Sequence, residues 1–273
     1  MNVFTRIWLC ISLLSCTTAR TLSFDPEKES LKKGVQVVAE HEYDAEKPSS
    51  KSHFTIRHSI IQYTKSGLKT DENRFDADTN ITAMWVFAYN KKKFLTEEKW
   101  LNPDSSIAYR VEYWYNRNNQ LVRENHYTTG NLLDKTYFYS YHDARTLSEK
   151  LVFDRDSNLI GKTKYYYVTG RVNEVSFTDD NSVEDIQTYS HDKNGNLVSV
   201  CEFNEEGEYL EKTSIGYDKM GNIKELMIGF MADSSLERHQ FKYEYDRNGN
   251  WTLKLDLKND MPSKIIVREY GYY

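Results

Sequence analysis

The residues of this sequence that could do chemistry are its histidines, one cysteine and a series of acidic turns. No pair among the seven histidines has a metal-binding spacing with a carboxylate nearby. Cys201 lies in the alternating stretch 197–201, which predicts a buried thiol rather than a nucleophile. The segment 192–196 (DKNGN) has the oxygen-rich character of a calcium loop but lacks its bidentate glutamate. We therefore predict no metal and no cofactor.

Familiar catalytic motifs are missing from the sequence. It contains no Gly-x-Ser-x-Gly elbow, no phosphate-binding loop and no Cys/His pairing. Aspartate and glutamate are abundant, 41 in total, but sequence spacing does not set two of them at the separation of a glycosidase pair. We predict that the protein is not an enzyme and has no catalytic residue. A hydrolase site assembled from distant strands stays open as an alternative.

Three tryptophans are candidates for stacking on a ligand. Trp114 alternates with Tyr113 and Tyr115, so its side chain is expected on the opposite, wet face of a strand. An indole ring offers a large apolar face with one polar edge, which suits contact with a sugar ring. A second functional hypothesis is therefore carbohydrate binding through Trp114, Trp85 and Trp100. The competing interpretation is that Trp114 packs beneath a loop or a second layer.

A turn frame recurs in the second half of the chain. It reads ring, Asp, two variable positions, Gly, Asn and an apolar residue. The aspartate can accept backbone N–H bonds, the glycine can take a positive φ, and the next strand follows at once. This frame assigns structural turn roles to Asp192, Gly195, Asp218, Gly221, Asp246 and Gly249.

The aromatic residue ahead of each turn recurs at a nearly constant spacing. The successive steps are 26, 26, 26, 24, 26, 28 and 28 residues, and even steps keep a side chain on one face of a strand. A weaker aromatic signal halfway through each unit gives about 13 residues per strand and turn, hence about 16 or 17 strands from residue 53 onward. The aligned residues are Tyr89, Tyr115, Tyr141, Tyr167, His191, Tyr217, Tyr245 and Tyr273.

These patterns predict an all-β fold. Short turns favour a tandem antiparallel β-hairpin meander, and a sheet of this size should curl into one long barrel-like or spiral wall. Aromatic residues make up 14% of the chain and charged residues 28%. We expect one aromatic, packed face and one charged, wet face.

The frame Tyr-Asp-x-x-Gly-Asn, present at 217–222 and 245–250, resembles the YD repeats of RHS-type proteins. It resembles more closely the short exported YD-like repeat proteins of Bacteroidetes-type bacteria. The similarity is good over 189–273 and weaker over 87–183, where Gly and Asp are often missing. The resemblance implies consecutive hairpins in one coiling sheet. It implies no particular activity, because such repeats serve as shells, stalks and interaction surfaces.

Residues 1–19 are typical of a secretory signal peptide. Arg6 precedes the apolar run 7–14, which is too short to span a bilayer, and small residues follow it. The run 13–16 (LLSC) resembles a lipobox, in which Cys16 would be lipidated and become the mature N-terminus; cleavage after Ala19 is the alternative. The polar stretch 20–52 predicts a tether with one short helix or strand near 35–40, and residues 53–273 the hairpin repeat domain.

The net charge and the export signal limit the class of partner that this protein can have. The net charge of −5 is spread without a basic stripe, which argues against nucleic acid and anionic membrane surfaces. An outer-membrane barrel competes, but the face carrying Tyr273 also carries Glu269, whereas a lipid face is continuously apolar. The sequence predicts a non-enzymatic envelope or surface protein that presents its repeats to an unknown protein or glycan. It would be periplasmic or surface-tethered, touching the membrane only through the Cys16 anchor, or else secreted.

Overall fold

The computed structural model describes residues 31–32, 34–45, 55–143, 146–168, 171–177 and 182–273. The predicted signal peptide, with Cys16, lies outside these residues. No helix in the described ranges is long and apolar enough to cross a membrane. The same ranges contain 18 strands and a 3₁₀ turn, η2 (Thr129–Asn131).

The first nine strands are β1 (Val35–Asp44), β2 (Thr55–Tyr63), β3 (Lys69–Phe75), β4 (Ile81–Tyr89), β5 (Leu95–Leu101), β6 (Ile107–Tyr115), β7 (Leu121–Thr128), β8 (Leu132–Tyr141) and β9 (Leu147–Asp154). The second nine are β10 (Leu159–Val168), β11 (Arg171–Phe177), β12 (Val183–His191), β13 (Leu197–Phe203), β14 (Tyr209–Tyr217), β15 (Ile223–Phe230), β16 (Leu236–Tyr245), β17 (Trp251–Lys258) and β18 (Met261–Tyr272).

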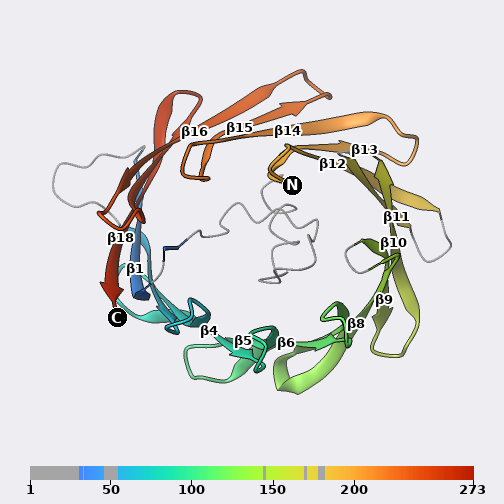
Figure 1. Ribbon diagram of the computed structural model, residues 1–273, viewed down its shortest axis with the longest axis horizontal. Helices are drawn as coiled ribbons and strands as arrows, with labels where there is room; N and C mark the ends of the chain where they lie inside the picture. The colour runs from blue at the N-terminus through green and yellow to red at the C-terminus, as the bar shows by residue number, and fades with distance from the viewer. Residues whose placement is uncertain (1–30, 33, 46–54, 144–145, 169–170, 178–181) are drawn as a thin grey trace.

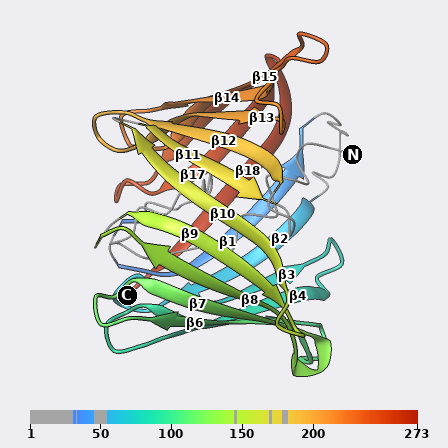
Figure 2. The same ribbon diagram turned by 90° about the vertical axis from the view of Figure 1, so that its right-hand side faces the viewer.

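The strands form one closed antiparallel barrel. Each strand pairs with its neighbours in the sequence, and β18 returns to pair with β1. Figure 1 shows the ring of strands, and Figure 2 shows them inclined across the barrel wall. The all-β hairpin meander is confirmed, and its curl is a closed barrel. Because closure leaves no unpaired edge, the backbone groups of every strand have partners on both sides.

Strand β1 corrects the predicted domain boundary. It lies inside the stretch 20–52 assigned to a tether, yet it joins β18 to β2, and Val38 on it is fully buried. The barrel therefore begins at β1 rather than at residue 53. The sequence predicted a short helix or strand near 35–40 but not its place in the barrel, because two of its buried positions are Glu40 and Glu42, which interrupt the apolar alternation.

The two faces of the wall differ in burial. Most buried side chains share the face that carries Tyr113, as expected for the concave side of a curved sheet, where side chains converge. Residues 31–32, just ahead of β1, lie inside the ring, and Lys32 contacts this face at Asn250. We call this side the inner face and the other the outer face. Buried inner-face residues include Val38, Ile61, Val111, Tyr113, Tyr139, Tyr165, Tyr189, Ile215, Ile228 and Ile266.

The packed core is a layer rather than a filled centre. An 18-stranded barrel with strands tilted by about 40° has a backbone radius of about 18 Å, too wide for opposite walls to touch through side chains. Apolar clusters accordingly run along the wall. One joins β5 to β8 through Leu95, Val111 and Tyr139, and another joins β1 to β2 through Val38 and Ile61.

The recurring turn is a type I turn followed by a left-handed residue. Gly195 N–H donates to the Asp192 carbonyl at 2.9 Å, and Gly195 has φ 85°. The Asp192 carboxylate accepts the backbone N–H of Asn194 at 2.8 Å and of Asn196 at 2.9 Å. The same geometry recurs at Asp218–Gly221 and Asp246–Gly249. Asn119 takes the glycine position with φ 62°.

The tyrosines ahead of the turns fasten neighbouring hairpins together. Tyr141 and Tyr217 each donate to the backbone carbonyl 20 residues earlier, at 2.8 Å. In the last two units this role passes to Tyr243 and Tyr270. The alignment ending on Tyr273 is therefore wrong: the strand register places Tyr272 on the inner face, and Tyr272 is the residue that bonds Asp246.

Candidate functional site

A row of glutamates lines the inner face at the 26-residue period of the repeat. Glu72, Glu98 and Glu124 lie on β3, β5 and β7, and each is at most 9% exposed. Lys150 and Glu174 continue the row on β9 and β11. A buried carboxylate is costly unless hydrogen bonds or opposite charges compensate it, so the partners of each glutamate indicate its role.

Both oxygens of each buried glutamate are engaged. Glu98 accepts the indole N–H of Trp100 at 2.7 Å and the hydroxyl of Tyr113 at 3.2 Å. Glu124 accepts the hydroxyl of Tyr139 at 3.0 Å and pairs with a ring nitrogen of His126 at 2.9 Å. Burial raises the pKa of Glu98, and the nearby charge of Glu124 adds to this effect.

Glu72 behaves differently because two cations flank it. Lys69 Nζ lies 2.5 Å from one oxygen of Glu72, and Arg74 Nε lies 2.6 Å from the other. Burial acts to raise the pKa of Glu72, but the charges and hydrogen bonds of Lys69 and Arg74 outweigh burial and hold that pKa below its ordinary value. This glutamate is therefore a buried anion with matched charge.

Five rings form a continuous strip beside the glutamates, which we call the aromatic band. It runs across β4 to β8, on the lower arc of Figure 1, over about 19 Å at the usual strand spacing. Successive ring centroids lie 6.1, 5.1, 5.7 and 4.5 Å apart. Trp100 is 37% exposed, and three others are partly exposed. The members in order are Trp85, Trp100, Tyr109, His126 and Tyr137.

Each glutamate of the row orients part of the band. Glu98 holds Trp100 by its indole N–H, as described above. Glu72 holds Arg74, whose guanidinium lies 4.3 Å from the ring centroid of Trp85. Glu124 holds His126, whose other ring nitrogen bonds the hydroxyl of Tyr109. The rings are therefore fixed before any ligand arrives, which is the arrangement that lowers the entropic cost of binding.

The three tryptophans predicted from the sequence do not form one surface. Trp85 and Trp100 pair edge to face on the inner wall. Trp114 lies on the outer face, as its parity predicted; it is 37% exposed and carries the guanidinium of Arg123 at 5.1 Å. Sequence reasoning missed the glutamate row, whose signal was a constant offset of 17 residues before Tyr89, Tyr115 and Tyr141.

The remaining candidates occupy structural positions. The turn aspartates and glycines lie at hairpin ends, away from the aromatic band. Cys201 is a half-buried free thiol on β13, opposite Thr188 and Lys212. Across the described ranges, no group of three or more His, Cys, Asp or Glu side chains is arranged to hold a metal ion.

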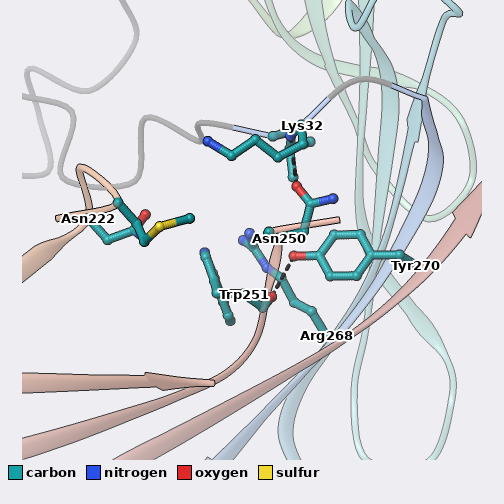
Figure 3. Close-up of a pocket in the computed structure, with 9 residues that line it drawn as sticks. Lys32, Asn222, Asn250, Trp251, Arg268 and Tyr270 are labelled. Atoms are coloured by element: carbon teal, nitrogen blue, oxygen red, sulfur yellow. Dashed lines mark hydrogen bonds between the residues drawn. The ribbon is translucent and has the colours of Figure 1, made fainter. Parts of the chain in front are cut away.

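A second inner-wall feature is a small pocket where the chain ahead of β1 meets β17 and β18 (Figure 3). Lys32 N–H donates to the Asn250 side-chain oxygen at 2.7 Å. The guanidinium of Arg268 lies 3.8 Å from the ring centroid of Trp251 and bonds Glu40 on β1 at 2.6 Å. Tyr270 donates to the Trp251 carbonyl at 2.6 Å. These contacts secure the seam at which the barrel closes.

The outer wall carries ion pairs within its strands. Arg110 on β6 contacts Glu97 at 3.2 Å and Glu112 at 2.5 Å, and Lys99 contacts Glu97 at 2.7 Å. Arg238 and Glu225 form a similar pair at 2.7 Å. Arg and Lys on a lipid-facing wall cost about 2–4 kcal/mol each near the bilayer midplane. The outer face also exposes large apolar side chains, among them Val86, Phe138 and Tyr166.

No protein-family model matches the sequence, and no curated protein matches it. Among solved structures, the chain is similar to a porin-like protein from Bacteroides uniformis, with 12% identity and TM-score 0.44 over 88% of this chain and 98% of that one. A porin-like protein from Bacteroides vulgatus gives 9% identity and TM-score 0.38 over 88% and 99%. A TcdB2-TccC3-Cdc42 structure gives 12% identity and TM-score 0.29 over 78% of this chain and 15% of that one. Scores below 0.5 do not establish a shared fold, and they leave the resemblance to YD repeats unconfirmed.

Proposed function

We propose that the protein is a non-enzymatic component of the bacterial envelope or cell surface whose barrel binds a partner on its inner wall. The observation that carries this proposal is the aromatic band held by buried glutamates. Four of the five rings are at least partly exposed, and the glutamates hold Trp85, Trp100 and Tyr109 directly or through Arg74 and His126. The repeat supplies the scaffold, and the band supplies the binding face.

Comparison of equivalent repeat positions indicates that the glutamates position the rings and are not needed for strand pairing. Val200 and Leu226 occupy the equivalent repeat positions on β13 and β15. The wall forms there with apolar side chains, which bury at no electrostatic cost. Glutamates in the first half therefore carry a cost that strand pairing does not require. Their contacts with Trp100, Arg74 and His126 supply the compensating role.

The bonding of these carboxylates supports a binding role over a catalytic one. Glu98 and Glu124 have both oxygens occupied by side chains of the wall. A general acid or a nucleophile needs an oxygen directed at the substrate. In this wall the carboxylates position rings instead.

The location we propose is the aqueous side of the envelope, reached by export and retained through a lipid on Cys16. The ion pairs of the outer wall support this location, because Arg and Lys are costly on a lipid-facing wall. Metabolic labelling with palmitate tests the anchor: the wild-type chain should take up label and fractionate with membranes, and Cys16→Ser should do neither. An unlabelled wild-type chain cleaved after Ala19 would overturn the anchor.

Capture from detergent-solubilised envelope tests the binding face. Tagged wild-type protein and Trp114→Ala, altered on the outer wall, should retain the same partner. Trp100→Ala, altered on the inner wall, should retain much less, and a cooperative thermal melt is the control that this variant still folds. Equal capture by Trp100→Ala and the wild type would place the binding face elsewhere.

A further inference from the structure

We propose that the ligand of the aromatic band is a neutral carbohydrate chain. This inference rests on the proposed function, because it names the class of molecule that the inner wall holds. It differs from the grouping suggested by sequence, since Trp114 takes no part and three inner-wall rings join Trp85 and Trp100.

The shape of the band favours a chain of sugars over one small molecule. Five rings follow one another across five neighbouring strands, and the spacing of their centroids stays between 4.5 and 6.1 Å. His126 is only 7% exposed, so the faces open to a ligand belong to the other four rings. An aromatic ring with an apolar face and a polar edge matches the alternation of C–H faces and hydroxyl edges on a sugar. A run of about 19 Å can contact several successive sugar units.

The charges beneath the band disfavour an ionic ligand. Glu72 is balanced by Lys69 and Arg74, and Glu124 is paired with His126. The guanidinium of Arg74 already occupies one face of Trp85, so a cationic ligand would meet a like charge at that end. An anion gains little either, because the carboxylates of Glu72, Glu98 and Glu124 are matched in number by the cations Lys69, Arg74 and Lys135. A polyhydroxylated neutral ligand meets no like charge and needs no net charge on the wall.

Polar groups at the far end of the band suit hydroxyl recognition. Lys135 lies opposite His126 across β7 and β8, on the inner face and beside Tyr137. Its ammonium can donate up to three hydrogen bonds. Rings for stacking and a nearby donor for hydroxyls are the two components from which carbohydrate sites are built.

Calorimetric titration of the full exported chain with neutral gluco-, manno-, xylo- and N-acetylglucosamine oligosaccharides tests the inference. At least one oligosaccharide should bind the wild type, and its monosaccharide should bind far more weakly. Trp100→Ala should weaken binding at least tenfold, whereas Trp114→Ala should leave it unchanged. Trp100→Tyr, which keeps a ring, should bind with an affinity between those of Trp100→Ala and Trp114→Ala. Thermal melts report whether each variant is folded.

Two results would overturn the inference. One is that no oligosaccharide binds the wild type, including the case in which tetramethylammonium binds instead. The other is that Trp114→Ala removes binding while Trp100→Ala keeps it. Periodate treatment of the envelope extract separates this failure from failure of the proposed function. If capture survives periodate and still requires Trp100, the partner binds the inner wall but is not a carbohydrate. That result would support the proposed function and overturn this inference.

Discussion

The hydroxyl of Tyr139 donates a hydrogen bond to Oε1 of Glu124 at 3.0 Å, from β8 to β7. The same relationship joins Tyr113 to Glu98 at 3.2 Å, and Tyr189 to Glu174 at 3.3 Å. In each case the tyrosine follows its glutamate by 15 residues. A repeat of hairpins has thus produced a repeat of buried carboxylate–phenol pairs along the inner wall.

Removing one phenol hydroxyl should show how much such a pair contributes to the free energy of unfolding. Tyr139→Phe leaves Glu124, which is 1% exposed, without one of its donors. We expect a loss of about 1–3 kcal/mol in the free energy of unfolding, measured by urea denaturation. Tyr166→Phe, on the outer face, should change it by less than about 0.5 kcal/mol. Equal losses for the two variants would show that the Tyr139 hydroxyl has no special role.

The glutamate row should give opposite pH dependences at two of its members. Burial raises the pKa of Glu98, so its folded carboxyl binds a proton more tightly than the unfolded one. The contribution of Glu98 to stability therefore falls as the pH rises above about 4. Relative to Glu98→Gln, the wild type should lose stability as the pH rises above about 4.

Glu72 should show the opposite pH dependence of stability to Glu98. Burial acts to raise its pKa, but the charges of Lys69 and Arg74 lower it overall, so this glutamate stabilises the fold above its unfolded pKa and loses that effect as the pH falls. Relative to Glu72→Gln, the wild type should lose stability as the pH falls below the ordinary value of 4.5, and the difference should level off above that value. Urea denaturation from acidic to neutral pH measures both differences, and slopes of the same sign would contradict the assignment.

His239 should add a separate dependence near neutral pH. The hydrogen bond from His239 to the Asp256 carboxylate, at 2.9 Å, is the largest cause that raises the pKa of His239, and the one to Glu237 at 2.8 Å adds to it. Its contribution to stability is complete below the ordinary value of 6.5 and disappears as the pH rises through the folded pKa. The stability difference between the wild type and His239→Gln should be larger at pH 5.5 than at pH 8.5.

Asp256→Asn is the control for that dependence. It removes the largest cause of the raised pKa of His239. In the Asp256→Asn background, the change in the free energy of unfolding caused by His239→Gln should therefore vary less with pH. Lys258, which contacts Glu237 at 2.9 Å, stays in place in both backgrounds. An undiminished pH dependence would point to Glu237 as the main partner.

The last hairpin turn should be sensitive to residue type at one position. Gly249 has φ 82°, where a β-branched side chain is strained although ordinary space surrounds the Cβ position. Gly249→Val should cost about 1–2 kcal/mol in the free energy of unfolding. Gly249→Asn should cost clearly less, since Asn119 already takes a left-handed conformation at the same turn position. Equal losses would mean that side-chain size, not backbone conformation, sets the cost.

The hairpin meander was predictable because its signals are local. The turn frame at Asp192 and Gly195 specifies a tight connection, and parity alone placed Trp114 opposite Tyr113. Closure was not predictable, because it depends on β1 meeting β18 more than 200 residues later, through the buried pair of Glu40 and Arg268. Glutamates at two inner positions of β1 also shorten its apolar alternation to the part around Val38.

The aromatic band escaped sequence reasoning for a similar reason. Its members belong to five strands, and bulges beside the turns change side-chain parity, as between Trp114 and Tyr115. Only strand register shows that Trp100 and Tyr109 share the inner face. The glutamate row did leave a periodic trace in the sequence, but a polar residue at a fixed offset becomes informative only when its face is known.

Photo-crosslinking from two alanines of one strand tests the central claim most directly. Ala83 lies on the inner face of β4 next to Trp85, and Ala88 lies on the outer face. A benzophenone amino acid at either position reacts with C–H bonds of a protein or a glycan. In intact cells we predict adducts from position 83 and none from position 88. Adducts from position 88 alone would contradict a binding face on the inner wall.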